Sequence, residues 1–138
     1  MHLAAENGQA DMFEIIFDEE DNKDEKNQKG ETPFIVACSK GHMNIALMLL
    51  KNSNELEIDL NAKDYHLKTA FYRACENGHL EIAEMLMKSS SELNIDLNIK
   101  NCDDWTAFHL ACYKGHLEIA EMIMKNSSEL SIDLDPPP

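Results

Sequence analysis

Residues 69–87 have the sequence TAFYRACENGHLEIAEMLM, and residues 106–124 have the closely similar sequence TAFHLACYKGHLEIAEMIM. The two stretches begin 37 residues apart, and a third copy, TPFIVACSKGHMNIALMLL, begins another 37 residues upstream at Thr32. An incomplete copy, HLAAENG, begins at His2. A fixed period of this length is typical of a stacked array, in which each unit buries its apolar face against its neighbours.

Each complete copy has the pattern of two short antiparallel helices. A threonine precedes the first helix, where its hydroxyl can accept hydrogen bonds from the free N–H groups of the first turn. A glycine follows nine residues later, where left-handed backbone closes a helix at little steric cost. Beyond each glycine, apolar residues recur at helical spacing and predict the second helix. The threonines are Thr32, Thr69 and Thr106, and the glycines are Gly41, Gly78 and Gly115.

The size and composition of the chain fit a single folded domain. It has 138 residues, 43% of them apolar, which is enough for a substantial core. Twelve basic residues against 26 acidic ones give a formal charge of −14, which argues against binding nucleic acid nonspecifically. No stretch approaches the roughly 18 apolar residues of a membrane span, and the first residues lack the layout of a signal peptide. Because its four cysteines are scattered, we expect free thiols and a cytoplasmic or other intracellular location, the nucleus included.

These motifs resemble those of ankyrin-repeat proteins. The family pattern Thr-Pro-Leu-His-x-Ala-Ala, followed by Gly-His, is matched by residues 32–38 and by Gly41-His42, and its closing Asp-[Val/Leu]-Asn is matched by residues 59–61 and 96–98. The resemblance implies an all-α solenoid of stacked helix-turn-helix units joined by β-hairpin-like loops. It also implies one ankyrin-repeat domain over residues 1–138, with repeats at about 1–26, 27–63, 64–100 and 101–135 and a tail at 136–138.

The repeats are longer than the family's usual 33 residues. Four extra residues precede each closing motif and account for the period of 37. We expect them to form an added helical turn or a longer outer loop, with Leu56, Leu93 and Leu130 packing repeat against repeat. The methionines of the second helices are expected to fill the core rather than to line an adaptable methionine-rich groove.

Two positions in the loops and first helices also depart from the pattern. Leu67 and Asp104 replace Gly30 in the loop before the first helix, so the turns of those repeats form without glycine. Arg73 occupies the position of Val36 in the preceding repeat. That position usually lies at the edge of the stack, and we expect the arginine to be partly exposed.

Cysteine and histidine recur with the repeat rather than in a cluster. Stacked repeats hold equivalent positions roughly 10 Å apart, beyond the roughly 4.4–6.8 Å Cα separation of a disulfide, so buried free thiols are expected at three cysteines. The recurring histidines are expected to form hydrogen bonds at the turn between the two helices. The cysteines are Cys38, Cys75 and Cys112, and the histidines are His42, His79 and His116.

A zinc site formed by Cys102, His109, Cys112 and His116 is not favoured. Zinc needs four ligands that converge at about 2.0–2.3 Å. Cys112 should point inward from a helix, whereas Cys102 lies in a hairpin-like loop, and the chain has no Cys-x-x-Cys motif. We therefore predict no metal and no cofactor.

The candidate binding site follows from the resemblance. Ankyrin-repeat proteins recognise partners with a concave face, which is formed by the hairpin tips and the first helices. Seven of the 12 basic residues fall on that face, and lysines beside aromatic side chains favour an acidic or partly apolar peptide or surface of another protein. The candidate partner-binding residues are Lys26, Gln28, Lys29, Glu31, Ser39, Lys40, Lys63, Tyr65, His66, Lys68, Glu76, Asn77, Lys100, Asp103, Trp105, Tyr113 and Lys114, and Cys102, Glu6 and Asn7 share the face.

We therefore expect a non-catalytic protein–protein interaction module that takes no small-molecule substrate. No catalytic dyad or paired carboxylate stands outside the repeat frame, so nothing indicates an enzyme. One alternative is that the lysines only serve solubility and Trp105 braces its loop. Another is a structural spacer in a larger ankyrin array, without a dedicated ligand. The incomplete first and last copies also leave head-to-tail self-association open, and the acidic run at 18–25 is expected to be a solvated loop.

Overall fold

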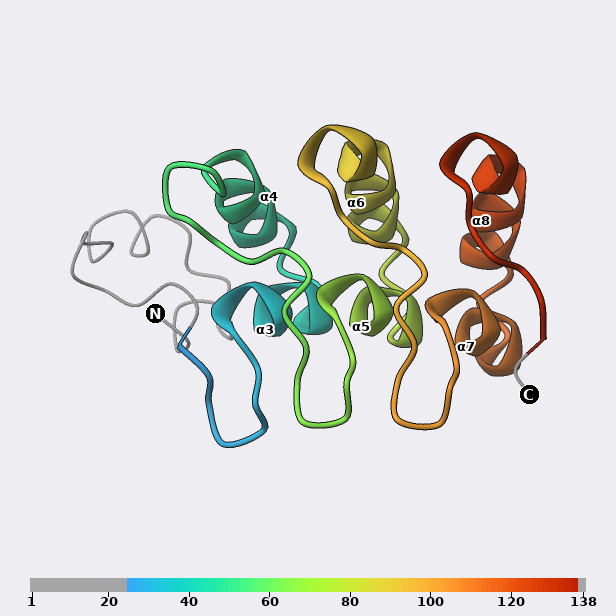
Figure 1. The fold of residues 1–138 in the computed structure, drawn as a ribbon, viewed down its shortest axis with the longest axis horizontal. Helices are drawn as coiled ribbons and strands as arrows, with labels where there is room; N and C mark the ends of the chain where they lie inside the picture. The colour runs from blue at the N-terminus through green and yellow to red at the C-terminus, as the bar shows by residue number, and fades with distance from the viewer. Residues whose placement is uncertain (1–24, 137–138) are drawn as a thin grey trace.

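The computed structural model describes residues 25–136, which form three pairs of antiparallel helices. The first helices lie in one row and the second helices in another, and hairpin-shaped loops project from the first row (Figure 1). The pairs are α3 (Pro33–Lys40) with α4 (Met43–Lys51), α5 (Ala70–Glu76) with α6 (Leu80–Leu93), and α7 (Ala107–Lys114) with α8 (Leu117–Leu130). The described residues contain no strand, and the predicted all-α repeat solenoid is confirmed.

Threonine caps begin the first helix of each pair, as predicted. The Oγ1 atom of Thr32 accepts a hydrogen bond from the N–H of Ile35 at 3.2 Å, and Thr69 caps α5 in the same way. Thr106 accepts from the N–H of His109, and its own N–H donates to Nδ1 of His109 at 2.9 Å. This reciprocal pair satisfies two N–H groups at the start of α7.

Left-handed glycines end two of the three first helices. Gly41 follows α3 with φ 81°, and Gly115 follows α7 with φ 77°. In the pair between them, α5 ends one residue earlier, and Asn77 is its C-cap. The glycine of that repeat, Gly78, comes next and is also left-handed. The local signals in each repeat therefore place the break between the two helices.

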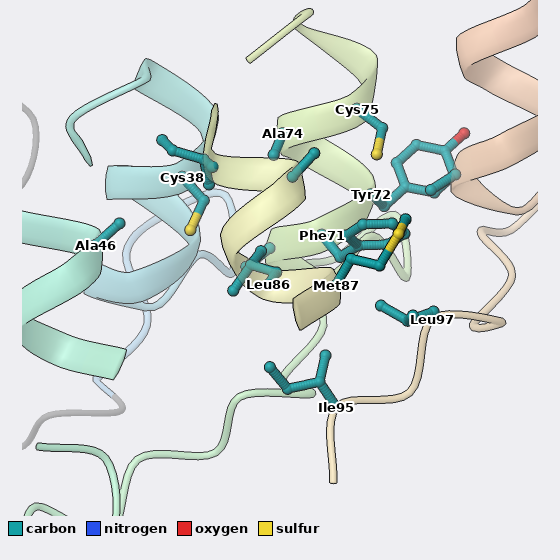
Figure 2. Close-up of a cluster of buried hydrophobic side chains, with 14 of the residues drawn as sticks. Cys38, Ala46, Phe71, Tyr72, Ala74, Cys75, Leu86, Met87, Ile95 and Leu97 are labelled. Carbon is teal, nitrogen blue, oxygen red and sulfur yellow. The ribbon is translucent and has the colours of Figure 1, made fainter. Parts of the chain in front are cut away.

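A single apolar core runs through the stack. Figure 2 shows Leu86 and Met87 of α6 gathered with Phe71 of α5, and Ile95 and Leu97 of the following loop belong to the same cluster. All five side chains are buried. Because residues of neighbouring pairs share this core, no pair buries its apolar face alone.

The extra residues of each repeat lengthen two of the outer helices. Both α6 and α8 have 14 residues, whereas α4 has nine and is followed by turns. Leu56, Leu93 and Leu130 pack against the core as partly buried side chains, and their expected contact between repeats stays a prediction. None of the described helices is long and apolar enough to cross a membrane.

The asparagine of each closing motif joins one repeat to the next. Asn61 Nδ2 donates to the carbonyl of Asn94 at 2.9 Å, and Asn61 Oδ1 accepts from the N–H of Asp96 at 2.8 Å. Asn98 makes the equivalent pair of bonds to Ser131 and Asp133, 37 residues further on. These bonds fix the spacing of the outer loops.

Two of the recurring histidines, His79 and His116, also join repeats. His79 Nε2 donates to the carbonyl of Ser39 at 2.9 Å, and His116 Nε2 donates to the carbonyl of Glu76 at 3.0 Å. The sequence predicts hydrogen bonds at the turn between the two helices of one repeat. In the structure, these histidines bond to the C-terminal end of the first helix of the preceding repeat. Each histidine therefore ties a free helix-end carbonyl to the next repeat.

The last helix pair exposes apolar positions that are covered in the pair before it. Cys75 and Met87 are buried, whereas their counterparts Cys112 and Met124 are exposed, Met124 by 53%. The expectation that the methionines fill the core is therefore right for Met87 and wrong for Met124. Leu117 is 67% exposed on the same pair. The prediction of a buried thiol is right for Cys38 and Cys75 but wrong for Cys112, because no further repeat follows it within residues 25–136.

Candidate partner-binding face

One side chain at the base of each hairpin loop organises that loop. Oδ1 of Asp64 accepts hydrogen bonds from the N–H groups of His66 and Lys68, at 2.9 and 3.0 Å. Asn27 and Asn101 make the same two bonds in their own loops. An Asn or Asp side chain that accepts from the backbone two residues on stabilises a tight turn without a strand ladder.

The tip of each loop contains a left-handed residue. Gly30, Leu67 and Asp104 have φ of 78°, 63° and 64°, so the turns of the later repeats form without glycine, as predicted. At Gly30 a side chain has no room, because a Cβ there would lie 2.5 Å from Cδ1 of Tyr65. The ring of Tyr65 therefore rests on the preceding loop.

Backbone hydrogen bonds hold the three loops in a row. The N–H of Tyr65 donates to the carbonyl of Lys29 at 3.3 Å, and the N–H of Cys102 donates to the carbonyl of His66 at 3.2 Å. Nζ of Lys26 also reaches the carbonyl of Lys63 at 2.9 Å. The residues of successive tips therefore form one surface.

The candidate residues differ in their exposure. Glu31 is buried, at 9% exposure, and its carboxylate accepts from Asn27 Nδ2 at 3.1 Å, so it stabilises the loop from inside. Ser39, Lys68, Glu76 and Trp105 are partly buried. The exposed candidates are Lys26, Gln28, Lys29, Lys40, Lys63, Tyr65, His66, Asn77, Lys100, Cys102, Asp103, Tyr113 and Lys114. Glu6 and Asn7 lie outside the described residues, as does the acidic run up to Asp24.

Aromatic rings gather at the last loop and α7. Trp105 meets Tyr113 edge-on, with ring centroids 5.4 Å apart, and meets His109 at 6.3 Å. Tyr113 remains 74% exposed, and Tyr65 on the neighbouring loop is 68% exposed. The Trp105 ring thus connects its loop to α7 and helps to position Tyr113. Trp105 can therefore brace the loop, which is one alternative from the sequence, and still lie beside the candidate binding face.

A polar network in the third repeat was not predicted from the sequence. Arg73 Nη2 lies 2.7 Å from Asp64 Oδ2, and Arg73 Nη1 lies 2.8 Å from Glu76 Oε1. Lys68 Nζ approaches the other Glu76 oxygen at 2.9 Å. Arg73 is partly exposed, as expected, but its partner Asp64 has no exposed side-chain surface. One signal was available: Asp64 is asparagine in the other two loops, and it changes together with position 73.

These contacts shift several pKa values. Burial raises the pKa of Glu76, but the hydrogen bonds and charges of Lys68 and Arg73 outweigh burial, and the net pKa lies below its ordinary value. Burial lowers the pKa of Arg73, and the hydrogen bond and charge of Asp64 reverse that effect and raise it. Burial, followed by the charge of Glu76, raises the pKa of Tyr72 to about 12. All three groups therefore keep their usual charge at neutral pH.

A second contact holds the ends of the first helices. Asn77 Nδ2 donates to the carbonyl and to Oγ of Ser39, at 2.9 and 3.1 Å. Lys68 Nζ also lies 5.5 Å from the centroid of the Tyr72 ring, and Tyr72 Oη accepts from Asn101 Nδ2 at 2.9 Å. Candidate residues from the second and third repeats, Ser39 and Asn77, are thus brought together, and Tyr72 joins the third repeat to Asn101 of the fourth.

Charge separates between the loop side and the outer side. We define the inner layer as residues 25–40, 62–76 and 99–114, and the outer layer as residues 41–61, 77–98 and 115–136. The inner layer carries eight basic and six acidic residues, whereas the outer layer carries three basic and twelve acidic residues. The outer acidic residues are Glu55, Glu57, Asp59, Glu81, Glu84, Glu92, Asp96, Glu118, Glu121, Glu129, Asp133 and Asp135.

The two histidines weighed as zinc ligands make other hydrogen bonds. His116 is bonded to the Glu76 carbonyl, and His109 Nδ1 accepts from the N–H of Thr106. Among residues 25–136, no group of three His, Cys, Asp or Glu side chains converges as metal ligands would. The described face offers exposed charge and aromatic surface.

Two family models match the sequence. The model described as ankyrin repeats (3 copies) matches residues 1–101, and the model described as ankyrin repeat matches residues 103–134. No curated protein matched the chain. The matched residues include every described helix.

Proposed function

The chain belongs to the ankyrin-repeat family, and we propose that it binds an acidic, partly apolar segment of another protein on the row of hairpin loops and first helices. Ankyrin repeats are generally protein–protein interaction modules and are typically non-catalytic. The face that binds, the chemistry of the partner and the residues that contact it are what we propose here.

The observation that carries the proposal is the position of the exposed lysines. Six of them lie in the inner layer, in a chain whose formal charge is −14. On a protein whose net charge is negative, a group of lysines creates a local positive field that steers and orients an acidic partner. These six are Lys26, Lys29, Lys40, Lys63, Lys100 and Lys114.

The two exposed tyrosines supply apolar anchors beside these lysines. Tyr65 rests on the loop before it, and Tyr113 is held against Trp105. A tyrosine that is already positioned loses little conformational freedom on binding, and buried aromatic residues are common hot spots. Lys68 and Glu76 are paired with each other, so we assign them to holding the face in shape.

Affinity capture from a cell lysate tests the proposed surface. The Lys63→Glu, Lys100→Glu double variant should lose a partner that the wild-type chain retains. The matched control is Lys51→Glu, Lys125→Glu, which makes the same change of charge on exposed lysines of the outer layer. Equal retention by both variants, or equal loss, would contradict the proposal.

The anchors are tested on the captured partner. Tyr65→Ala and Tyr113→Ala should each weaken its binding by more than about 1 kcal/mol. Leu117→Ala serves as the control, because Leu117 is as exposed as Tyr65 but lies at the start of α8. Wild-type affinity in both tyrosine variants would reject them as anchors. Capture of nucleic acid instead, with affinity that falls steeply with salt, would reject a protein partner.

The exposed apolar residues of the last pair support the alternative of a spacer in a larger array. Leu117, Met124 and Cys112 lie at positions that a further repeat would cover, and an uncapped repeat is costly in water. Fusion of a fifth repeat with a polar outer face should raise the melting temperature if this alternative holds. Sedimentation of the unmodified chain tests head-to-tail association through the same residues, which would give a mass that rises with concentration.

A further inference from the structure

A groove of about 690 Å³ lies between α6 and α8, on the outer layer. The residues from α6 recur at intervals of three and four, so they form one face of that helix. The lining residues are Leu80, Glu84, Met87, Lys88, Ser91, Glu118, Glu121, Met122, Lys125, Asn126, Glu129 and Leu130.

The bottom of the groove is apolar and adaptable. Leu80, Met122 and Leu130 are partly buried and pack against the core, and Met87 is almost fully buried at 2% exposure. Methionine side chains are flexible and polarisable, so they adjust to partners of different shape. The groove therefore offers contact to an apolar stripe.

The sides of the groove are acidic. Four glutamates line it against two lysines, and Lys88 is already paired with Glu84, with Nζ and Oε1 2.7 Å apart. Glu118, Glu121 and Glu129 all lie on α8. The surrounding outer layer carries twelve acidic residues against three basic ones, so the local charge favours a cationic occupant.

The added helical turn gives this groove its length. Both α6 and α8 have 14 residues, which corresponds to about 21 Å at 1.5 Å per residue. Between α6 and the nine-residue α4 the corresponding groove is smaller, at about 460 Å³, and Glu84 and Lys88 line it as well. The four extra residues per repeat thus lengthen a surface on the side away from the hairpin loops.

We propose that the α6–α8 groove docks a basic amphipathic helix of a partner protein. The apolar face of such a helix would lie over Leu80, Met122 and Leu130. The lysine or arginine side chains of that helix would face the glutamates of α8. This site is separate from the lysine-bearing face and takes a partner of opposite charge, so the two proposals stand or fall independently.

The test uses the full chain and a synthetic 14-residue peptide of lysine and leucine whose leucines form one helical face, as long as α6 and α8. Binding is measured by fluorescence anisotropy at about 0.15 M salt, where long-range attraction is screened. The Glu118→Gln, Glu121→Gln variant should bind at least about fivefold more weakly than the wild type. The matched control, Glu55→Gln, Glu92→Gln, removes two exposed carboxylates that do not line the groove and should bind as the wild type does.

Methyl spectra of the methionines locate the bound peptide. The Met122 signal, assigned with Met122→Leu, should shift on binding, whereas Met124 on the same helix does not line the groove and should not. A shift of Met124 instead of Met122 would overturn the proposal. So would absence of binding, equal weakening in both double variants, or equal binding of a scrambled peptide without an apolar face. Self-association that Glu118→Gln, Glu121→Gln abolishes would assign the groove to a second copy and would also overturn it.

Discussion

Arg73 donates two hydrogen bonds to a single oxygen of Asp64: its Nε and Nη2 atoms lie 3.0 and 2.7 Å from Oδ2. The other oxygen, Oδ1, accepts the two backbone bonds that shape the loop. The Asp64 side chain has no exposed surface, and Arg73 is 18% exposed. The arginine is therefore the charge that allows a buried carboxylate to organise the hairpin loop of the third repeat.

Arg73→Ala should destabilise the chain by about 3 kcal/mol, because it leaves the buried Asp64 carboxylate without its partner. The double variant Asp64→Asn, Arg73→Leu restores the residue types of the fourth repeat, Asn101 and Leu110. It should lie within about 1 kcal/mol of the wild type, since an apolar replacement of a whole buried pair is often neutral. Urea unfolding of the three chains checks this, and a double variant less stable than Arg73→Ala would contradict the account.

Glu76 should make the stability of the chain sensitive to acid. Its pKa is lower in the folded chain than its ordinary value of 4.5, so the folded state binds that proton less readily than the unfolded state. The stabilisation is fully present above about pH 4.5 and is lost as the pH falls through the lower folded pKa. Glu76→Gln should be less stable than the wild type at pH 7 and should lose less stability on acidification.

Thermal unfolding of both chains between pH 3 and pH 7 measures this difference. Glu84→Gln is a suitable control, because Glu84 also pairs with a lysine but is far more exposed, at 45% against 16% for Glu76. Exposed pairs contribute little to stability, so this control should follow the wild-type profile. Parallel profiles for Glu76→Gln and the wild type would show that the network does not couple folding to pH.

Two of the four thiols should react with a thiol reagent in the native chain. Cys102 and Cys112 are exposed, whereas Cys38 and Cys75 are buried and their pKa values are raised by burial. Burial also raises the pKa of Cys112, so its reaction should speed up as the pH rises, because the thiolate is the reactive form. The buried pair should react only at the rate of unfolding. Protection of Cys112, identified with Cys112→Ser, would mean that the last pair is covered in solution.

Gly41→Ala should cost more stability than Gly115→Ala. Both residues are left-handed, and that conformation costs a non-glycine residue about 1–2 kcal/mol. A Cβ on Gly41 would also lie 2.7 Å from Cε1 of His79, which bonds the Ser39 carbonyl, whereas a Cβ on Gly115 meets nothing within 4 Å. We expect a difference of about 1 kcal/mol in denaturant unfolding, the net value of one hydrogen bond. Equal costs would show that the histidine moves aside freely.

Local structure could be predicted because its causes lie within one repeat. Thr69 and Tyr72 are three residues apart in the chain, and the cap between them needs nothing from elsewhere. The left-handed turns at Leu67 and Asp104 likewise depend on hydrogen bonds inside each loop. The period of 37 then places these units in a stack, and the all-α solenoid follows.

Contacts between repeats determine which side chains are buried and where a groove forms, and the sequence pattern of one repeat does not predict these features. Cys75 and Cys112 occupy equivalent positions in successive repeats, yet of these two only Cys75 has a further helix pair packed over it among the described residues. The groove between α6 and α8 likewise forms only where side chains of two repeats lie next to each other. Hydrogen bonding between near neighbours is determined by the order of residues along the chain, whereas the burial of a side chain depends on distances in space, and those exist only once the repeats have packed.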